Sequence, residues 1–273
     1  MTVVRDTIGE LLQGRIGLDV ASISPKVLQH AIRDRVKATG AKDEAGYLDV
    51  LEHDADERQA LIDAVVVPET WFFRDAGPFA YLDAWLGERD GAGPAPKSLR
   101  VLSMPCASGE EPYSIALTLA GFPDLAQRAV IHAVDISRRL LVRAREGVYG
   151  RHALRAMPAS LLERYFTPTS EGQVLDPSIR SRVSFFHANA LEFPGDPPGV
   201  PYDLVFCRNL LIYLDQPSRR RLAEVLDRLL APGGVLFLGH AEVPHLFCPA
   251  YQPVRWPKAF AAIKPVAGLE PPG

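Results

Sequence analysis

Polar residues stand directly after three apolar runs of this chain, at Asp135, Asn189 and the pair Arg208-Asn209. Each run has the length and composition of a buried strand. Because the carboxyl ends of parallel strands meet at one edge of a sheet, we expect these side chains to converge on a ligand crevice. An aspartate that closes the second strand is placed to bind the hydroxyl groups of a ribose. The set predicts a site for a nucleotide-type ligand.

A fourth polar position lies in residues 99–119. Residues 101–104 read as a strand, residues 105–109 as a turn, and a helix then begins with Glu110, Glu111 and Pro112 in its first turn. The turn has a single glycine, Gly109, which excludes both the GxGxxG fingerprint and a P-loop. Two glutamates would repel a phosphate, so a ligand bound here would carry hydroxyl groups or positive charge; from this stretch alone a purely structural turn remains equally open.

Composition narrows the class of protein. The 273 residues carry 30 Lys and Arg against 33 Asp and Glu, a net charge of -3, which does not favour a nucleic-acid binder. Cys106, Cys207 and Cys248 are scattered, without the spacing of a zinc site or a disulfide framework, so we expect no metal and a reducing compartment. No run of about 18 apolar residues is present, so we expect a cytoplasmic protein that is not inserted in a membrane.

The elements that position these residues fall into two patterns. Residues 1–67 show helical periodicity throughout, with helices predicted at 26–38, 44–54 and 57–67 and Ser24-Pro25 opening the first of them. One face of that helix is basic, through Lys26, His30, Arg33 and Lys37. From charge alone this face is either solvated or a docking surface for an acidic partner, and both remain open.

From residue 99 onward strands and helices alternate, which predicts an α/β fold with a doubly wound parallel sheet. The alternation lapses at 149–182, where we expect an inserted subdomain with a helix over 154–166 and short hairpin strands near 173–175. We divide the chain into a helical domain (1–75), a linker helix and loop (76–98), a sheet domain (99–264) and a Pro-rich tail (265–273).

The segment PETWFFRD, residues 68–75, is dense in aromatic side chains. Trp71, Phe72 and Phe73 are typical of a core or of a seam between domains. Arg74 beside them is less ordinary, because a partly buried guanidinium requires an anion or hydrogen-bond acceptors.

Five motifs together resemble the CheR-type chemotaxis receptor methyltransferases, which use S-adenosylmethionine. They are PETWFFRD (68–75), SGEEPYSIA (108–116), AVDIS (133–137), CRNLLIY (207–213) and LAPGGVLFLGHAE (230–242). The resemblance runs over nearly the whole chain, to about residue 262. It implies an all-helical N-terminal domain, a Rossmann-like methyltransferase sheet and a small antiparallel β insertion.

The resemblance also implies roles for individual residues. It places the cofactor against Thr70, Arg74, Glu111, Asp135, Asn189, Ala190, Arg208 and Asn209. Asp135 would hold the ribose, Asn189 and Ala190 would flank the adenine, and Glu111 would lie near the amino-acid or ribose end. Arg74 and Tyr213 are the candidate catalytic residues that arrange the reacting groups. For His240 and Glu242 we prefer a structural role, closing the loop after the last strand.

The implied reaction transfers a methyl group to glutamate side chains in the cytoplasmic helices of methyl-accepting chemoreceptors, by a monomeric enzyme. Since receptor methylation helices are acidic, the strip formed by Lys26, His30, Arg33 and Lys37 would dock them. Two alternative functions remain. One is a methyltransferase for nucleic acid or a small molecule, of which methylation of an adenine amino group would favour an Asn/Asp-Pro-Pro-aromatic motif where Arg208-Asn209 stand. A non-catalytic binding module would be favoured by loss of Arg74 or Tyr213, and both are present.

Overall fold

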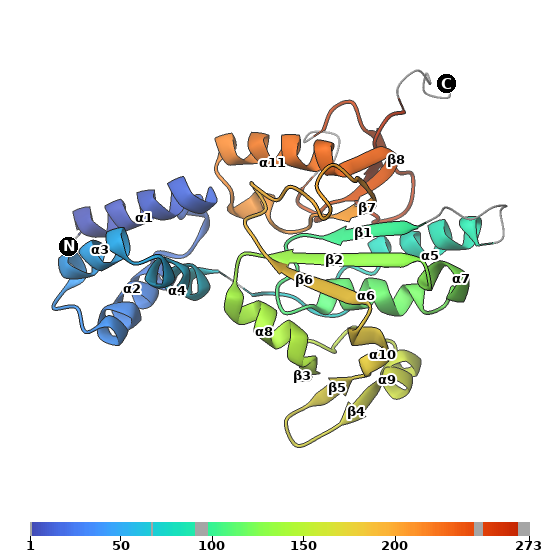
Figure 1. The fold of residues 1–273 in the computed structure, drawn as a ribbon, viewed down its shortest axis with the longest axis horizontal. Coiled ribbons are helices and arrows are strands. Elements are labelled where there is room, and N and C mark those ends of the chain that lie inside the picture. Colours follow the sequence, from blue (N-terminus) through green and yellow to red (C-terminus); the bar gives the residue numbers. More distant parts are fainter. Residues whose placement is uncertain (1, 67, 91–97, 243–247, 267–273) are drawn as a thin grey trace.

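The computed structural model describes residues 2–66, 68–90, 98–242 and 248–266. Residues 91–97, in the predicted linker loop, and residues 267–273, most of the predicted Pro-rich tail, lie outside this described part. In Figure 1 helices α1–α4 form one body and the remaining elements a second body around a sheet.

The N-terminal body contains α1 (Thr2–Ile16), α2 (Pro25–Thr39), α3 (Glu44–His53) and α4 (Ala55–Val65), with a short 3₁₀ turn η1 (Val20–Ser22). Local sequence sets the helix limits: Pro25 occupies the first turn of α2 and Gly40 ends it in the left-handed region at φ 71°. Asp54 begins α4 by accepting hydrogen bonds from the backbone amides of Asp56 and Glu57. Fully buried side chains such as Ile32, Tyr47 and Leu61 form its core. The all-helical prediction for this region is confirmed.

The second body is built on a seven-stranded sheet with the order β6-β2-β1-β7-β8-β10-β9. Its strands are β1 (Leu99–Ser103), β2 (Ala129–Asp135), β6 (Val183–His187), β7 (Tyr202–Phe206), β8 (Leu230–Phe237), β9 (Gln252–Pro253) and β10 (Ala261–Ile263). Strands β6, β2, β1, β7 and β8 run parallel to one another. Strand β10 runs antiparallel to β8, and β9 runs antiparallel to β10. The order reverses at β1, so the crevice of a doubly wound sheet lies at its carboxyl end. The predicted parallel sheet is confirmed, although β9 and β10 were not foreseen.

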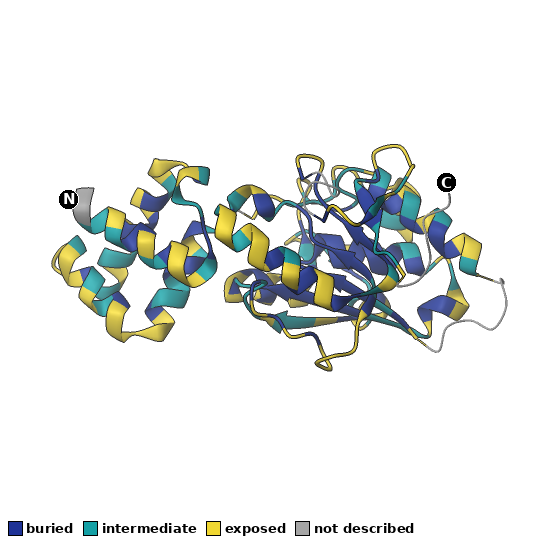
Figure 2. Ribbon diagram, turned by 90° about the horizontal axis from the view of Figure 1, so that it is seen from above, coloured by how far each residue is buried: buried dark blue, intermediate teal, exposed yellow. Residues whose placement is uncertain are grey.

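Helices cover both faces of the sheet, and successive strand residues alternate between them. Val101 and Phe206 face a core with α5 (Gly77–Arg89), α6 (Glu110–Leu119) and α7 (Pro123–Ala126). Leu102 and Val205 face a second core with α11 (Gln216–Leu229). Figure 2 shows the buried strands inside and exposed residues on the outer sides of the helices. Near-continuous apolar strands are what a sheet buried on both faces requires.

The inserted subdomain lies between β2 and β6. It contains α9 (Ala159–Tyr165), α10 (Pro177–Arg180) and a three-stranded antiparallel sheet of β3 (Val148–Tyr149), β5 (Gln173–Leu175) and β4 (Phe166–Pro168). The predicted helix over 154–166 is wrong in its first half, because α9 begins only at Ala159. Pro158 precedes it, and a proline disfavours helical backbone in the residue before it.

The two bodies are joined along the edge that carries η2 (Leu211–Tyr213). Leu18 and Leu214 form an antiparallel bridge. The amide of Asp19 donates to the carbonyl of Tyr213 at 2.8 Å, and the amide of Asp215 donates to the carbonyl of Gly17 at 3.0 Å. Of the helices in the described ranges, none combines the length and the hydropathy that crossing a membrane requires.

Candidate active site

A cleft of about 920 Å³, counting the part open to solvent, lies between the helical body and the carboxyl ends of β1, β2, β6 and β7. Its sheet side includes Ala107, Asp135, Asn189, Ala190, Asn209 and Tyr213. Its other wall is apolar and comes from the helical body, through Ile16, Leu18, Ile23, Val65 and Val66. Among the described residues that line it, Asp135 is the one charged side chain.

Asp135 ends β2 with its carboxylate held by backbone amides. Oδ2 accepts a hydrogen bond from the amide of Ala107 at 2.7 Å, and Oδ1 accepts one from the amide of Ser137 at 2.9 Å. Burial raises the pKa of Asp135, while these two amides act in the opposite direction. Each oxygen keeps a second lone pair, so the fixed carboxylate can accept two hydroxyl groups, as a ribose offers.

Asn189 follows β6 and is locked by two hydrogen bonds. Its Nδ2 donates to the carbonyl of Arg15 in α1 at 3.1 Å, and its Oδ1 accepts from the amide of Leu191 at 3.0 Å. The amide side chain therefore ties the helical body to the end of β6. Ala190 lies next to it in the cleft wall, where a small side chain leaves room for a flat ring.

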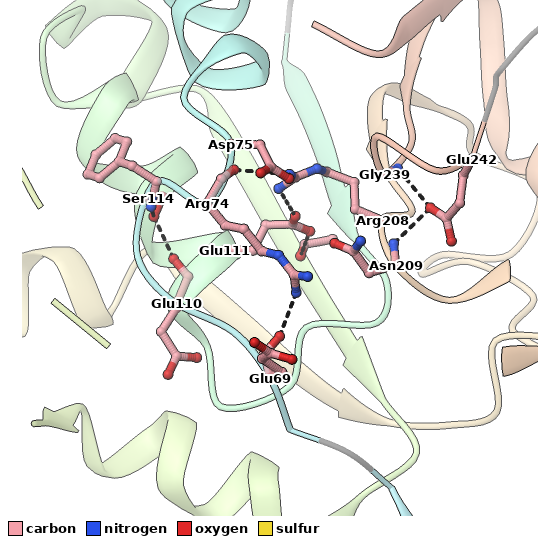
Figure 3. A network of polar contacts seen from close by, with 12 residues as sticks. Glu69, Arg74, Asp75, Glu110, Glu111, Ser114, Arg208, Asn209, Gly239 and Glu242 are labelled. Carbon is pink, nitrogen blue, oxygen red and sulfur yellow. Dashed lines mark hydrogen bonds and ion pairs between the residues drawn. The ribbon is translucent and has the colours of Figure 1, made fainter. Parts of the chain in front are cut away.

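Asn209 follows β7 in the left-handed region, with φ 59°, a conformation that asparagine tolerates better than most residues. Glu242 fixes this turn: its carboxylate accepts hydrogen bonds from the amides of Asn209, Leu211 and Gly239 at 2.7 to 2.8 Å (Figure 3). These three bonds agree with the structural role predicted for Glu242.

Glu111 and Arg208 form a buried ion pair and do not line the cleft. The guanidinium of Arg208, whose side chain is 2 % exposed, donates to Glu111 Oε2 at 2.9 Å and to Asp75 Oδ2 at 2.8 Å (Figure 3). Glu111 Oε1 accepts from the hydroxyl of Ser103 at 2.8 Å. Burial raises the pKa of Glu111, and the charge of Arg208 opposes this. The pair therefore joins α6 and the end of β7 to the segment that carries Arg74.

Thr70 and Arg74 are both half-buried and also lie outside the cleft lining. The Arg74 guanidinium donates to the carbonyl of Glu69, and its Cζ lies 4.6 Å from the centre of the Trp71 ring. Its Nε is buried without a hydrogen-bond partner in the described structure. The carbonyl of Arg74 accepts from Arg208 at 3.0 Å, which fixes the backbone beside the buried ion pair.

Tyr213 lies in the cleft, on η2, and packs against the core of the helical body. Lys26, His30, Arg33 and Lys37 are all exposed on α2, opposite the buried Leu28, Ala31 and Ile32. The structure thus brings Asp135, Asn189, Ala190, Asn209 and Tyr213 together and leaves Thr70, Arg74, Glu111 and Arg208 outside the lining.

Sequence reasoning missed the apolar wall that the helical body contributes. Ile16, Leu18, Ile23, Val65 and Val66 read as ordinary core residues of that body, since apolar residues at helix ends carry no signal of a ligand. Their position in the cleft arises only when the two bodies pack together.

The fold and the cleft define a Rossmann-like protein that binds a nucleoside-type ligand without phosphates. The comparisons give the family: residues 68–247 match the CheR methyltransferase, SAM binding domain, and residues 6–66 match the CheR methyltransferase, all-alpha domain. The chain belongs to the CheR methyltransferase family, and S-adenosylmethionine is the cofactor of its sheet domain. The cleft fits this cofactor, because it offers a carboxylate for a ribose, apolar walls, and no basic side chain for a phosphate among the described lining residues.

The similar proteins carry two kinds of name, biofilm formation methyltransferase and chemotaxis protein methyltransferase. The chain is 42% identical over 260 residues to a probable biofilm formation methyltransferase WspC of Pseudomonas aeruginosa, covering 94% of this chain and 61% of that protein. It is 36% identical to chemotaxis protein methyltransferase 2 of Vibrio cholerae (86% of this chain, 83% of that protein) and 34% identical to the chemotaxis protein methyltransferase of Escherichia coli (86% and 82%). The chain thus spans about three fifths of the length of the WspC relatives.

Proposed function

We propose that this chain transfers the methyl group of S-adenosylmethionine to glutamate side chains of chemotaxis or related chemosensory receptors, forming methyl esters in the cytoplasm. The observation that carries the proposal is the cleft itself, which combines one fixed carboxylate with apolar walls at the carboxyl end of the sheet. The relatives named chemotaxis protein methyltransferase support the receptor as substrate.

The reaction requires the protein mainly to position the methyl group and the accepting carboxylate. Bound S-adenosylmethionine supplies a methyl group made electrophilic by its sulfonium. A glutamate with a pKa near ~4.3 is already ionised at neutral pH, so the site needs no general base. The chain has to hold a carboxylate oxygen in line with the methyl group at about 3 Å and to exclude water. The described cleft lining holds no histidine, and its one carboxylate, Asp135, is held by backbone amides, which is consistent with this requirement.

We assign the cofactor contacts to the residues that line the cleft. Asp135 holds the ribose hydroxyls, Asn189 and Ala190 flank the adenine, and Asn209 lies on the β7 side. Tyr213 presents its hydroxyl to the reacting carboxylate. Arg74 orients that carboxylate without giving up a proton, since a guanidinium stays charged. Thr70, Glu111 and Arg208 do not touch the ligand in this assignment. They hold the segment that carries Arg74 in place.

The proposal is tested by incubating the protein with tritiated S-adenosylmethionine and receptor-containing membranes, followed by treatment with base. We expect label in the receptor that base releases as methanol, and loss of this label with Asp135→Ala. Base-stable label would identify another acceptor atom, and absence of label from every receptor supplied would contradict receptor methylation.

The exposed basic strip on α2, comprising Lys26, His30, Arg33 and Lys37, is our candidate for docking the acidic receptor helices, with the enzyme acting as a monomer. Charge attraction of this kind weakens with salt. We expect Arg33→Glu to raise KM for the receptor at low salt, with a smaller difference at high salt. The matched control is Arg220→Glu, an exposed arginine on α11. An unchanged KM for Arg33→Glu at low salt would contradict docking on this face.

A further inference from the structure

Trp71 carries two arginines on its ring. The Cζ of Arg155, from the inserted subdomain, lies 3.5 Å from the ring centre, and the Cζ of Arg74 lies 4.6 Å from it. An indole face attracts a guanidinium, by about 0.5–1 kcal/mol at exposed sites and more where water is excluded. Two cations gathered on one half-buried ring repel each other, so a further anion near them would lower the energy of this arrangement.

Within the described residues, neither guanidinium has a carboxylate oxygen within 4.0 Å; Glu111, Asp75 and the other acids that form ion pairs are engaged elsewhere. Arg74 donates to the carbonyl of Glu69, and Arg155 donates to the carbonyl and the ring of His152. Arg74 also has a buried Nε without an acceptor in this part of the chain. Donors of both guanidiniums therefore remain free for a ligand, since each group has five.

The acids near Arg74 share one guanidinium, whose single charge balances only one of the two carboxylates. Asp75 and Glu111 both bind the same guanidinium, that of Arg208. The charge of Arg74 lowers the pKa of Glu111 and offsets the second of these two carboxylates, so Arg155 is left as the net positive charge beside this network. Figure 3 shows Arg74 next to this network, and Asn209 of the cleft lining lies in the same view.

Arg155 is brought to Trp71 by fixed backbone and ring contacts. The amide of Phe72 donates to the carbonyl of Ala153 at 2.9 Å. The Phe72 ring packs edge-on against Tyr149 at 4.8 Å and against Phe166 at 5.5 Å, and both of these belong to the inserted sheet. The position of Arg155 therefore follows from the docking of the subdomain on the 68–75 segment.

We propose that Trp71, Arg74 and Arg155 form a carboxylate-binding subsite for an acidic peptide segment, which is the acceptor segment of the receptor under the proposed function. Arg74 orients the carboxylate that is methylated. Arg155 binds a neighbouring carboxylate of the same segment and so selects acceptor glutamates that have an acidic neighbour. The planar guanidinium suits this task, because it stacks on the indole and still presents paired donors to a carboxylate.

The kinetic test compares Arg155→Gln with Arg164→Gln. Arg164 is a matched control, since it is an exposed arginine of the same subdomain that lies on the ring of Tyr165 at 5.1 Å. We expect Arg155→Gln to raise KM for the receptor about tenfold, with kcat changed less than twofold and the Kd for S-adenosylhomocysteine unchanged. Arg155→Lys should recover part of the loss, because it keeps the charge without the planar donors. Arg164→Gln should leave all three values unchanged.

A KM for Arg155→Gln within twofold of the unsubstituted protein would overturn the subsite. A rise in KM accompanied by an equal loss of S-adenosylhomocysteine affinity would also overturn it, because that result indicates a loosened fold. The effect should vanish on a receptor whose acceptor glutamate has its acidic neighbours changed to glutamine, and an undiminished effect there would contradict selection by a second carboxylate.

A binding measurement separates this proposal from the reaction. Tryptophan fluorescence is followed while a helical peptide rich in glutamate is added in the presence of S-adenosylhomocysteine, with Trp71→Phe used to assign the signal. We expect a Trp71-dependent change that Arg155→Gln abolishes. Peptide binding without methyl transfer would contradict the proposed function and support the subsite. Methyl transfer that Arg155→Gln leaves unchanged, together with no Trp71-dependent signal, would contradict the subsite but not the proposed function.

Discussion

At the scale of single residues, Arg208 is the clearest case of a side chain whose neighbours decide its role. Its place after β7 suggests a ligand contact, yet its guanidinium binds Glu111 and Asp75 in the interior. A buried ion pair adds little net stability, but removing one partner leaves an uncompensated buried charge. The role of Arg208 is to fix positions, because its side chain links three segments around Arg74.

We expect Arg208→Met to lower the free energy of unfolding by about 3–5 kcal/mol, since Glu111 is then left charged and buried. Adding Glu111→Gln should recover most of this loss. Urea unfolding of both variants measures the effect, with exposed Arg220→Met as the control. Unchanged stability of Arg208→Met together with weakened cofactor binding would show that Arg208 instead contacts the ligand.

The buried carboxyl group of Glu110 should make the stability of the fold depend on pH. Its buried carboxylate accepts from the hydroxyl of Ser108 at 2.9 Å, and burial raises the pKa of Glu110. The folded state therefore binds this proton more tightly than the unfolded state, so the contribution of Glu110 to stability falls as the pH rises through its folded pKa. We expect the stability of Glu110→Gln relative to the unsubstituted protein to increase between pH 4 and pH 7. A difference that is flat with pH would contradict the raised pKa.

At the scale of elements, helix α4 positions the loop between β2 and α8 (Arg138–Glu146). The hydroxyl of Ser137 donates to Asp63 Oδ1 at 2.6 Å, while the amide of Ser137 donates to Asp135. Gln59 of the same helix donates to the carbonyl of Ile136 at 2.8 Å. The helical body therefore holds the carboxylate that we assign to the ribose, besides closing the cleft.

Asp63→Ala should weaken S-adenosylhomocysteine binding roughly fivefold, because a hydrogen bond of about 1 kcal/mol that orients the loop is lost. Asp63→Asn keeps the acceptor oxygen and should restore most of the affinity. Asp56→Ala, which removes an exposed ion pair to Arg138 at 2.8 Å, is the control. Calorimetry gives the dissociation constants, and equal affinities for Asp63→Ala and Asp56→Ala would refute positioning through Asp63.

At the scale of the whole molecule, the cleft exists only while the two bodies are docked, because each supplies one wall. The docking contacts include the amides of Asp19 and Asp215, which bind carbonyls across the boundary. A ligand that needs both walls stabilises the docked state, by about 2.7 kcal/mol at a concentration of 100 times Kd.

We expect S-adenosylhomocysteine to slow hydrogen exchange at the amides of Asp19 and Asp215. The amide of Asp54, which bonds within the helical body at 2.8 Å, should exchange at an unchanged rate. Mass spectrometry of peptides that cover these positions measures the effect. Equal slowing in both regions would point to general stabilisation, and no slowing at the boundary would contradict closure around the ligand.

The sequence by itself determined the elements whose signals are local. Helix α2 differs from its predicted limits by one residue at each end, and α3 by one residue at its end, because apolar periodicity, caps and prolines act over a few residues. The helix over 154–166 failed where Pro158 overrode its periodicity. The place of Asp135 in the crevice followed from strand order in a parallel sheet.

Tertiary structure alone decided which side chains meet. The pairing of Arg208 with Glu111, the apolar wall from the helical body and the two arginines on Trp71 all join residues far apart in the chain. No local pattern encodes such contacts, because they depend on how complete elements pack. A charged residue reads the same in the sequence whether its partner is a ligand, another side chain or water.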